Sequence, residues 1–234
     1  MWTRPPPPGF QGLRDDLPLT QCHQTLPHWR QSGATYFVTY HLFDSLPQPK
    51  LRELEALKGD WERKHPEPRG KDAWDDLARE AMRRADAWLD QGIGGCQLKS
   101  PEISQLIADA MHRSDGSRCE LGCYIIMPNH VHVVLRPLAP ESDPLEMILK
   151  HWKASSLRSI EEKLKTAKSK PSEMMWHRES FDHIVRDAEQ LWRILQHIGS
   201  NPKMAGLPEG ASQSWVSPAW IDAGWRFEIG ERGV

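Results

Sequence analysis

Two histidines flank a single valine between two apolar runs, and this short segment constrains the fold more than any other part of the chain. It reads Met127-Pro128-Asn129-His130-Val131-His132, with Tyr124-Ile125-Ile126 before it and Val133-Val134-Leu135 after it. Residues i and i+2 of a β-strand point to the same face, so His130 and His132 would lie side by side while Val131 turns into a core. Two neutral imidazoles at this spacing can hold one divalent ion. A strand that carries two unrelated histidines is the alternative.

Length and composition predict one domain with an insertion, or else two small domains. The chain has 234 residues, of which 38% are hydrophobic, and this is enough for a core. No apolar run approaches the length that crosses a bilayer, and the first residues do not begin a signal peptide. We therefore expect a cytoplasmic protein that has no membrane partner.

The charge of the chain is small overall but unevenly distributed. The formal net charge is −2, which is not typical of a strongly basic nucleic-acid-binding protein. Between Lys150 and Lys170, however, seven basic residues stand against two acidic ones, so this segment has a net charge of +5. It is interpreted either as a solvated helix face or as a surface that contacts phosphates.

Apolar periodicity and turn residues predict alternating strands and helices. The expected strands are 34–43, 119–126, 131–136 and 181–186, and the expected helices lie within 50–90, at 101–113, from 144 onward and at 188–200. A break near His65-Pro66 divides the segment 50–90 into two helices. Gly199 and Pro202 are expected to end the last helix.

This order of elements predicts a ferredoxin-like α+β sandwich, an antiparallel sheet with helices packed on it. The domain would span residues 34–207 and contain a helical insertion at 50–95 after the first strand. A partly mobile N-terminal arm at 1–33 would precede it. A C-terminal tail at 208–234 would follow it and fold back on the domain.

The segment around His130 and His132 resembles the HUH motif of single-tyrosine transposases, and among them the REP-associated tyrosine transposases. Further blocks at 36–42, 176–186 and 198–202 are similar to segments of that family and occur in the same order. The resemblance implies an HUH domain that binds REP-like hairpins of single-stranded DNA and uses Mg²⁺ or Mn²⁺. It also implies metal-assisted strand cleavage and transfer through a phosphotyrosyl intermediate.

The chain departs from that family at the nucleophile. The family's tyrosine lies four residues before the Asn-Pro that ends the helix, and this position is His197 here. The chain has three tyrosines, Tyr36, Tyr40 and Tyr124, and all of them fall in or beside expected strands. His197 is therefore interpreted as a replacement for a lost tyrosine, as a third metal ligand or as a histidine nucleophile. Tyr124 would serve as a substitute only if it shared the face of the histidine pair.

Candidate site residues follow from the motif and from the resemblance. Metal ligands would be His130, His132 and Asn201, because Asn201 lies one helical turn after His197. The catalytic set would be His197 with the two motif histidines. The candidates for phosphate contact are Lys150, Lys153, Arg158, Arg178, Arg186 and Lys203.

Three functions are compatible with these residues. The first is a transposase-like protein that binds single-stranded DNA hairpins and is cleavage-deficient because it lacks the tyrosine. The second is a domesticated, non-catalytic regulatory protein that binds DNA or RNA. The third is a metal phosphodiesterase with a three-histidine site. A monomer is expected rather than a dimer.

Overall fold

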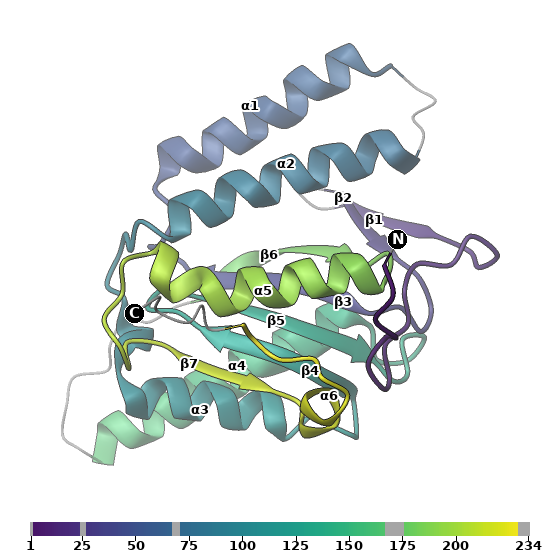
Figure 1. Ribbon diagram of the computed structural model, residues 1–234. Coiled ribbons are helices and arrows are strands. Elements are labelled where there is room, and N and C mark those ends of the chain that lie inside the picture. Colours follow the sequence, from purple (N-terminus) through teal and green to yellow (C-terminus); the bar gives the residue numbers. More distant parts are fainter. Residues whose placement is uncertain (1, 24–26, 67–70, 167–175, 229–234) are drawn as a thin grey trace, which may run out of the picture.

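The computed structural model describes residues 2–23, 27–66, 71–166 and 176–228 and has an α+β architecture (Figure 1). In chain order its elements are β1 (Thr20–His23), β2 (Pro27–Arg30), β3 (Tyr36–Leu42), α1 (Gln48–Lys64), α2 (Lys71–Leu89), the 3₁₀ turn η1 (Gln97–Lys99), α3 (Pro101–His112), β4 (Cys119–Ile126), β5 (His130–Pro137), α4 (Leu145–Thr166), β6 (Trp176–Ile184), α5 (Ala188–Met204), β7 (Gln213–Val216) and α6 (Pro218–Asp222).

Five strands form one sheet in the order β6-β3-β5-β4-β7, and every neighbouring pair is antiparallel. Apart from the edge strand β7, the sheet consists of β3, β4, β5 and β6. Along the chain these four strands form a strand–helix–strand–strand–helix–strand unit, in which β3 is the first strand and β6 the fourth. Their spatial order puts the fourth beside the first and the third beside the second. This is the ferredoxin-like arrangement, so the predicted α+β class is confirmed. The predicted strand at 181–186 is the second half of β6, which begins earlier because Trp176 pairs with Leu42 of β3.

The pairing of β3 with β5 determines which side chains surround the two motif histidines. Thr39 is the partner of His132, and His41 is the partner of His130. Directly opposite residues of an antiparallel pair project from the same face. Val131 belongs to the apolar cluster on the other face, as the spacing predicts.

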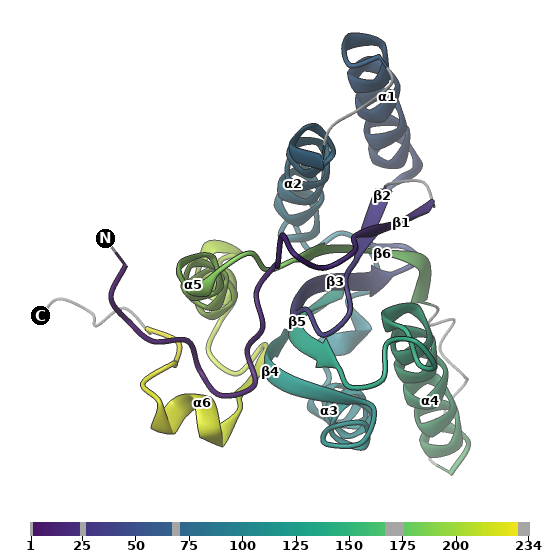
Figure 2. The same ribbon diagram turned by 90° about the vertical axis from the view of Figure 1, so that its right-hand side faces the viewer.

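Helices cover both faces of the sheet. One apolar cluster joins α3 and α4 to one face, and a second joins α1, α2 and α5 to the face that carries the motif histidines (Figures 1 and 2). The basic helix α4 therefore lies on the opposite side of the sheet from His130 and His132. Across the described residues, no helix is both long and apolar enough to cross a membrane.

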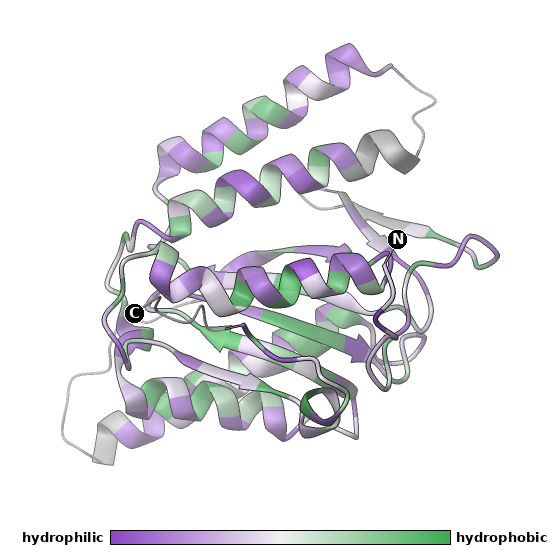
Figure 3. Cartoon of the chain, viewed as in Figure 1, coloured by the Kyte–Doolittle hydropathy of each residue, from purple (hydrophilic) through white to green (hydrophobic). Residues whose placement is uncertain are grey.

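The predicted helical insertion consists of α1 and α2. Helix α1 ends at Lys64, next to the predicted break. It projects from the domain and is mostly hydrophilic in Figure 3. Helix α2 lies between α1 and the rest of the domain (Figure 1) and buries Ala81, Ala85 and Leu89 against the sheet side of the molecule. The insertion is thus anchored through α2.

The predicted end of the last helix was wrong. Helix α5 continues through Pro202 to Met204, and its carbonyls at Asn201 and Lys203 accept the amides of Ala205 and Gly206. Gly206 has a φ of 66°, the left-handed conformation that commonly ends helices. Gly199 does not end the helix either. Instead, it permits close packing, since a Cβ at this position would lie 2.7 Å from the Phe227 side chain.

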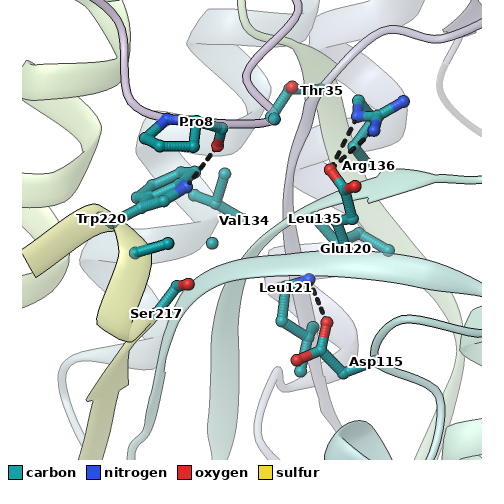
Figure 4. Close-up of a pocket in the computed structure, with 13 residues that line it drawn as sticks. Pro8, Thr35, Asp115, Glu120, Leu121, Val134, Leu135, Arg136, Ser217 and Trp220 are labelled. Carbon is teal, nitrogen blue, oxygen red and sulfur yellow. Dashed lines mark hydrogen bonds and ion pairs between the residues drawn. The ribbon is translucent and has the colours of Figure 1, made fainter. Parts of the chain in front are cut away.

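The first and last segments that the structure describes pack together, next to β4 and β7. Strand β7 pairs with β4, which confirms that the tail folds back on the domain. The indole of Trp220 donates a hydrogen bond to the Pro8 carbonyl at 3.0 Å, beside a pocket of ≈ 200 Å³ (Figure 4). Trp225 makes the same kind of bond to Pro5. The N-terminal arm is also more regular than expected, because β1 and β2 form an antiparallel pair.

Candidate metal centre and nucleic-acid interface

The orientation of His130 is determined by its neighbour Asn129. The Asn129 amide nitrogen donates to the carbonyls of Leu89 and Ile93 at 3.1 and 3.0 Å. The amide oxygen therefore faces His130 Nδ1, 2.8 Å away. Because an amide oxygen only accepts hydrogen bonds, Nδ1 must carry the proton. The Nε2 atom of His130 is left with a lone pair that can bind a cation.

His132 presents its Nε2 atom to the same point. The distance between Nε2 of His130 and Nε2 of His132 is 3.0 Å. The Thr39 hydroxyl lies 2.8 Å from His132 Nδ1 and can accept a hydrogen bond from its N–H. When Nδ1 of His132 carries the proton, the Nε2 lone pairs of His130 and His132 are directed to the same point. Two neighbouring ligands at right angles, each about 2.1 Å from a metal, are about 3.0 Å apart.

Both motif histidines are neutral at physiological pH. Each is fully buried. Burial, with a smaller effect from neighbouring imidazoles, lowers the pKa of His130 to about 3 and the pKa of His132 well below its ordinary value. A neutral imidazole is the form that binds metal ions.

Two carboxylates reach the histidines from the insertion. Asp86 lies in the last turns of α2, and Asp90 follows that helix. The Asp86 Oδ2 atom is 3.6 Å from His197 Nε2, and the Asp90 Oδ1 atom is 3.9 Å from His130 Nε2. One donor atom each from Asp86, His132 and His197 lies within 4.8 Å of the others.

The sequence prediction missed both carboxylates. For Asp86 the sequence did contain a signal, because this residue falls on the apolar stripe of α2 formed by Met82, Ala85 and Leu89. A carboxylate within a buried stripe requires a partner. The charged composition of the segment concealed this signal, since most carboxylates in a mixed-charge helix are solvated.

His197 forms the solvent side of the cluster. Its side chain is 34% exposed, whereas those of His130 and His132 are buried. Its ring lies 5.7 Å from the ring of His132 and meets Phe37 edge-on. The Asp86 carboxylate raises the pKa of His197 above its ordinary value, although burial acts in the opposite direction.

Asn201 and Asp90 complete the buried side of the cluster. Asn201 is fully buried one turn after His197. Burial, and then the nearby Asp86, raise the pKa of Asp90 to about 6, while the Asn201 amide and His197 oppose this shift. The predicted group of His130, His132, His197 and Asn201 is therefore brought together.

The donor set fits a divalent ion. Several buried polar atoms of the cluster make no hydrogen bond within the described residues: Asp86 Oδ1, Asp90 Oδ1, His197 Nε2, and both Asn201 side-chain atoms. Unpaired buried polar groups cost free energy. A cation ligated by imidazole and carboxylate groups would compensate for this cost.

Comparison with known proteins gives one distant similarity. No protein-family model matches the chain, and no curated protein matches it. A solved structure of a REP-associated tyrosine transposase bound to a REP hairpin is similar over 76% of this chain and 72% of its own, with 14% sequence identity and a TM-score of 0.34. At this distance the similarity supports no assignment of activity.

All three tyrosines of the chain lie in the apolar cluster on the other side of the sheet, with α3 and α4. Tyr124 pairs with Val133, not with a motif histidine, and its hydroxyl lies 3.0 Å from His112 Nε2. Tyr36 bonds to the backbone of Gln31, and Tyr40 contacts Met111. No tyrosine in the chain can therefore reach a phosphate held at the histidine pair.

The predicted phosphate contacts fall in two places. Lys150 and Arg158 are exposed on α4, and Arg178 is exposed on β6. Lys150 and Arg178 border a cavity of ≈ 730 Å³ between these two elements. Lys153 lines the same cavity, but its ammonium donates to the carbonyls of residues 177–179 at 2.9–3.3 Å. Its charge is thus used to hold β6 against α4.

The remaining basic candidates belong to α5 and the segment before it. Arg186 lines a groove that also contains His197. Lys203 is exposed in the last turn of α5. Lys168 and Lys170, which contribute to the predicted basic segment, lie outside the described residues. Contact of any of these side chains with phosphate stays a prediction.

Proposed function

We propose that this chain is a metal-dependent nucleic-acid-binding protein, akin to the REP-associated tyrosine transposases, that binds hairpins of single-stranded DNA without forming a phosphotyrosyl bond. The observation that carries the proposal is the cluster at the histidine pair. Donor atoms of Asp86, His132 and His197 lie within 4.8 Å of one another. Asp86 Oδ1 and His197 Nε2 are buried there without a hydrogen bond among the described residues. All three tyrosines lie on the other face of the sheet, which supports the proposal that no phosphotyrosyl bond forms.

His130 and His132, with Asp86 or His197, would hold the ion, and Asn201 could add an amide oxygen. A bound divalent ion supplies positive charge to a phosphate oxygen and can activate water. The mixture of imidazoles and carboxylates favours Mn²⁺ over Mg²⁺, because Mg²⁺ prefers oxygen ligands. His197 stands at the solvent side, where it can donate a hydrogen bond to a bound phosphate.

The test is a denaturing-gel assay on an end-labelled DNA hairpin with single-stranded flanks. The unaltered protein is compared with His197→Tyr in Mn²⁺, in Mg²⁺ and in a chelator. We expect the unaltered protein to bind the hairpin without becoming linked to it. If the unaltered protein becomes covalently attached to DNA, or binds no hairpin at moderate salt, the proposal is wrong.

A second candidate is a metal phosphodiesterase that hydrolyses the strand with water. The pair of Asp86 and His197 favours it, because an imidazole oriented by a carboxylate can transfer a proton to or from a water molecule or a leaving oxygen. This candidate predicts cleaved DNA without a protein adduct and loss of cleavage in His197→Ala. Intact DNA after prolonged incubation with Mn²⁺ would exclude it.

The third candidate is a non-catalytic regulatory protein that binds DNA or RNA, and its RNA-binding form is distinguished by which nucleic acid the protein prefers. An RNA hairpin of the same sequence is measured beside the DNA hairpin under identical salt. Preference for DNA supports the proposal above, and preference for RNA by an order of magnitude supports the regulatory alternative.

A further inference from the structure

A groove of ≈ 600 Å³ between α2 and α5 opens beside His197. Its lining includes four arginines: Arg79, Arg83, Arg186 and Arg193. The one carboxylate in the lining is Asp187, which accepts a hydrogen bond from the Gln190 amide at 2.7 Å and caps α5. The groove is thus basic along its length and reaches the candidate metal centre.

Helix α2 connects the two sites. Arg79, Arg83 and Asp86 are separated by four and three residues, so they lie along one face of the helix. With a rise of 1.5 Å per residue, Arg83 is about 4.5 Å and Arg79 about 10.5 Å from Asp86 along the helix axis. The helix that brings a carboxylate to the metal centre therefore also places two guanidinium groups at increasing distance from it.

Helix α5 repeats this arrangement on the other wall. Arg193 precedes His197 by one turn, and Arg186 precedes the helix. Both walls thus place positive charge next to a residue of the metal centre. A chain of phosphates that passes between α2 and α5 would meet these groups in succession, as in other grooves that follow a single-stranded backbone.

The arginines of the groove are accessible for such a role. Arg79 pairs with Asp76, Arg83 with Glu80 and Arg193 with Glu189, each within its own helix. The side chains of Arg79, Arg83 and Arg193 are 51%, 69% and 68% exposed. Exposed ion pairs of this kind are weak, and salt screens them further. A phosphate can therefore replace the carboxylate partner at little cost.

We propose that this groove binds the sugar-phosphate backbone of the single-stranded DNA that flanks the hairpin. The strand would run from the candidate metal centre along α2 and α5. The inference rests on the proposed function, because it assigns the path of the strand outside the hairpin.

The test measures binding of two fluorescent DNA hairpins, one blunt and one with a single-stranded extension, by anisotropy over a range of salt. The variant is the double substitution Arg79→Gln with Arg83→Gln. The matched control is Arg63→Gln on α1, because Arg63 has the same kind of exposed pair with Asp60. Helix α1 lies on the other side of α2 from α5 (Figures 1 and 2).

We expect the double variant to bind the extended hairpin about tenfold or more weakly and to lose about 1.4 from the salt slope, as for two phosphate contacts on a single strand. The control should match the unaltered protein, and all variants should bind Mn²⁺ equally in calorimetry. Arg193→Gln, on the other wall, should also weaken binding of the extended hairpin.

Three outcomes would overturn the inference, and they are distinguishable. If the unaltered protein binds the extended hairpin but the double variant binds it equally well, the groove is not the path of the strand, and the proposed function stands. If the unaltered protein binds no hairpin, the proposed function fails together with the inference. Equal loss with blunt and extended hairpins would place the hairpin stem, not its flank, on the groove and would also refute the inference.

Discussion

At the scale of single residues, the candidate site depends on hydrogen bonds that orient its ligands. Asn129 orients His130, and Thr39 contacts His132 at 2.8 Å. Such outer partners determine which ring nitrogen carries the proton and therefore which one can bind a cation. The motif histidines alone would not define the site.

Substitution of Thr39 tests this dependence. Thr39→Val keeps the shape of the side chain but removes the hydroxyl that His132 Nδ1 contacts. We expect Mn²⁺ affinity, measured by calorimetry, to fall by about 10- to 100-fold. Thr39→Ser keeps the hydroxyl and should bind Mn²⁺ nearly as the unaltered protein does. Equal affinity in the Val and Ser variants would show that Thr39 does not orient the ligand.

At the scale of elements, α5 shows that a glycine and a proline do not always end a helix. Gly199 allows the helix to approach Phe227, and the chain leaves the helix only at Gly206. The sequence signal for an end at 199–202 was therefore outweighed by packing of the tail against the helix. The error matters for function, because the continued helix holds Asn201 in the buried cluster.

Two helix-interior glycines provide a matched test of this packing. In Gly199→Ala, the new Cβ would be 2.7 Å from Phe227, so we expect a loss of about 1–3 kcal/mol in the free energy of unfolding. In Gly59→Ala on α1, the nearest atom is the Arg63 guanidinium at 3.7 Å. There the better helix propensity of alanine should stabilise the protein by about 0.5–1 kcal/mol. Urea unfolding measures both, and a stabilised Gly199→Ala would contradict the packing argument.

At the scale of the whole molecule, a buried ion network attaches the N-terminal arm to the domain. Asp182 of β6 is 2.6 Å from His28 Nδ1 and 2.6 Å from an Arg30 nitrogen. Arg30 also reaches Glu146 of α4 at 2.7 Å. The network thus joins β2, β6 and α4. Burial alone would raise the pKa of Asp182, but Arg30 and His28 outweigh it and hold that pKa well below its ordinary value.

This network predicts a pH dependence of stability. Because the folded-state pKa of Asp182 is depressed, its contribution is fully present above the unfolded value of about 3.9 and is lost as the pH falls toward the folded value. At pH 7, Asp182→Asn should lower the free energy of unfolding by about 3 kcal/mol, since it leaves the largely buried Arg30 guanidinium without its anionic partner. The difference from the unaltered protein should narrow between pH 4 and pH 2 in urea unfolding.

The control for this prediction is Asp16→Asn, because Asp16 pairs with Arg14 at the surface, where both side chains are more than half exposed. Its unfolding should follow that of the unaltered protein at every pH. A constant difference between Asp182→Asn and the unaltered protein from pH 7 to pH 2 would show that the Asp182 carboxylate is not linked to folding.

The amino-acid sequence determined those features that depend on local periodicity. The alternation around His130 and His132 predicted a strand with both imidazoles on one face, because the period of a pleated strand is fixed by its backbone. The order of strands and helices likewise predicted the antiparallel α+β sandwich and the two-helix insertion. The sequence also predicted that Tyr36, Tyr40 and Tyr124 fall in or beside strands, and they lie in β3 and β4.

Only the tertiary structure decided what surrounds the two histidines. Helix periodicity shows that Asp86 lies on the buried stripe of α2, but not that this stripe packs beside β5. In the same way, the charge of α4 is evident from the sequence, whereas its place on the opposite face of the sheet is not. The reason is physical: which helix covers which face depends on burial of apolar surface between segments far apart in the chain, and no local pattern encodes that choice.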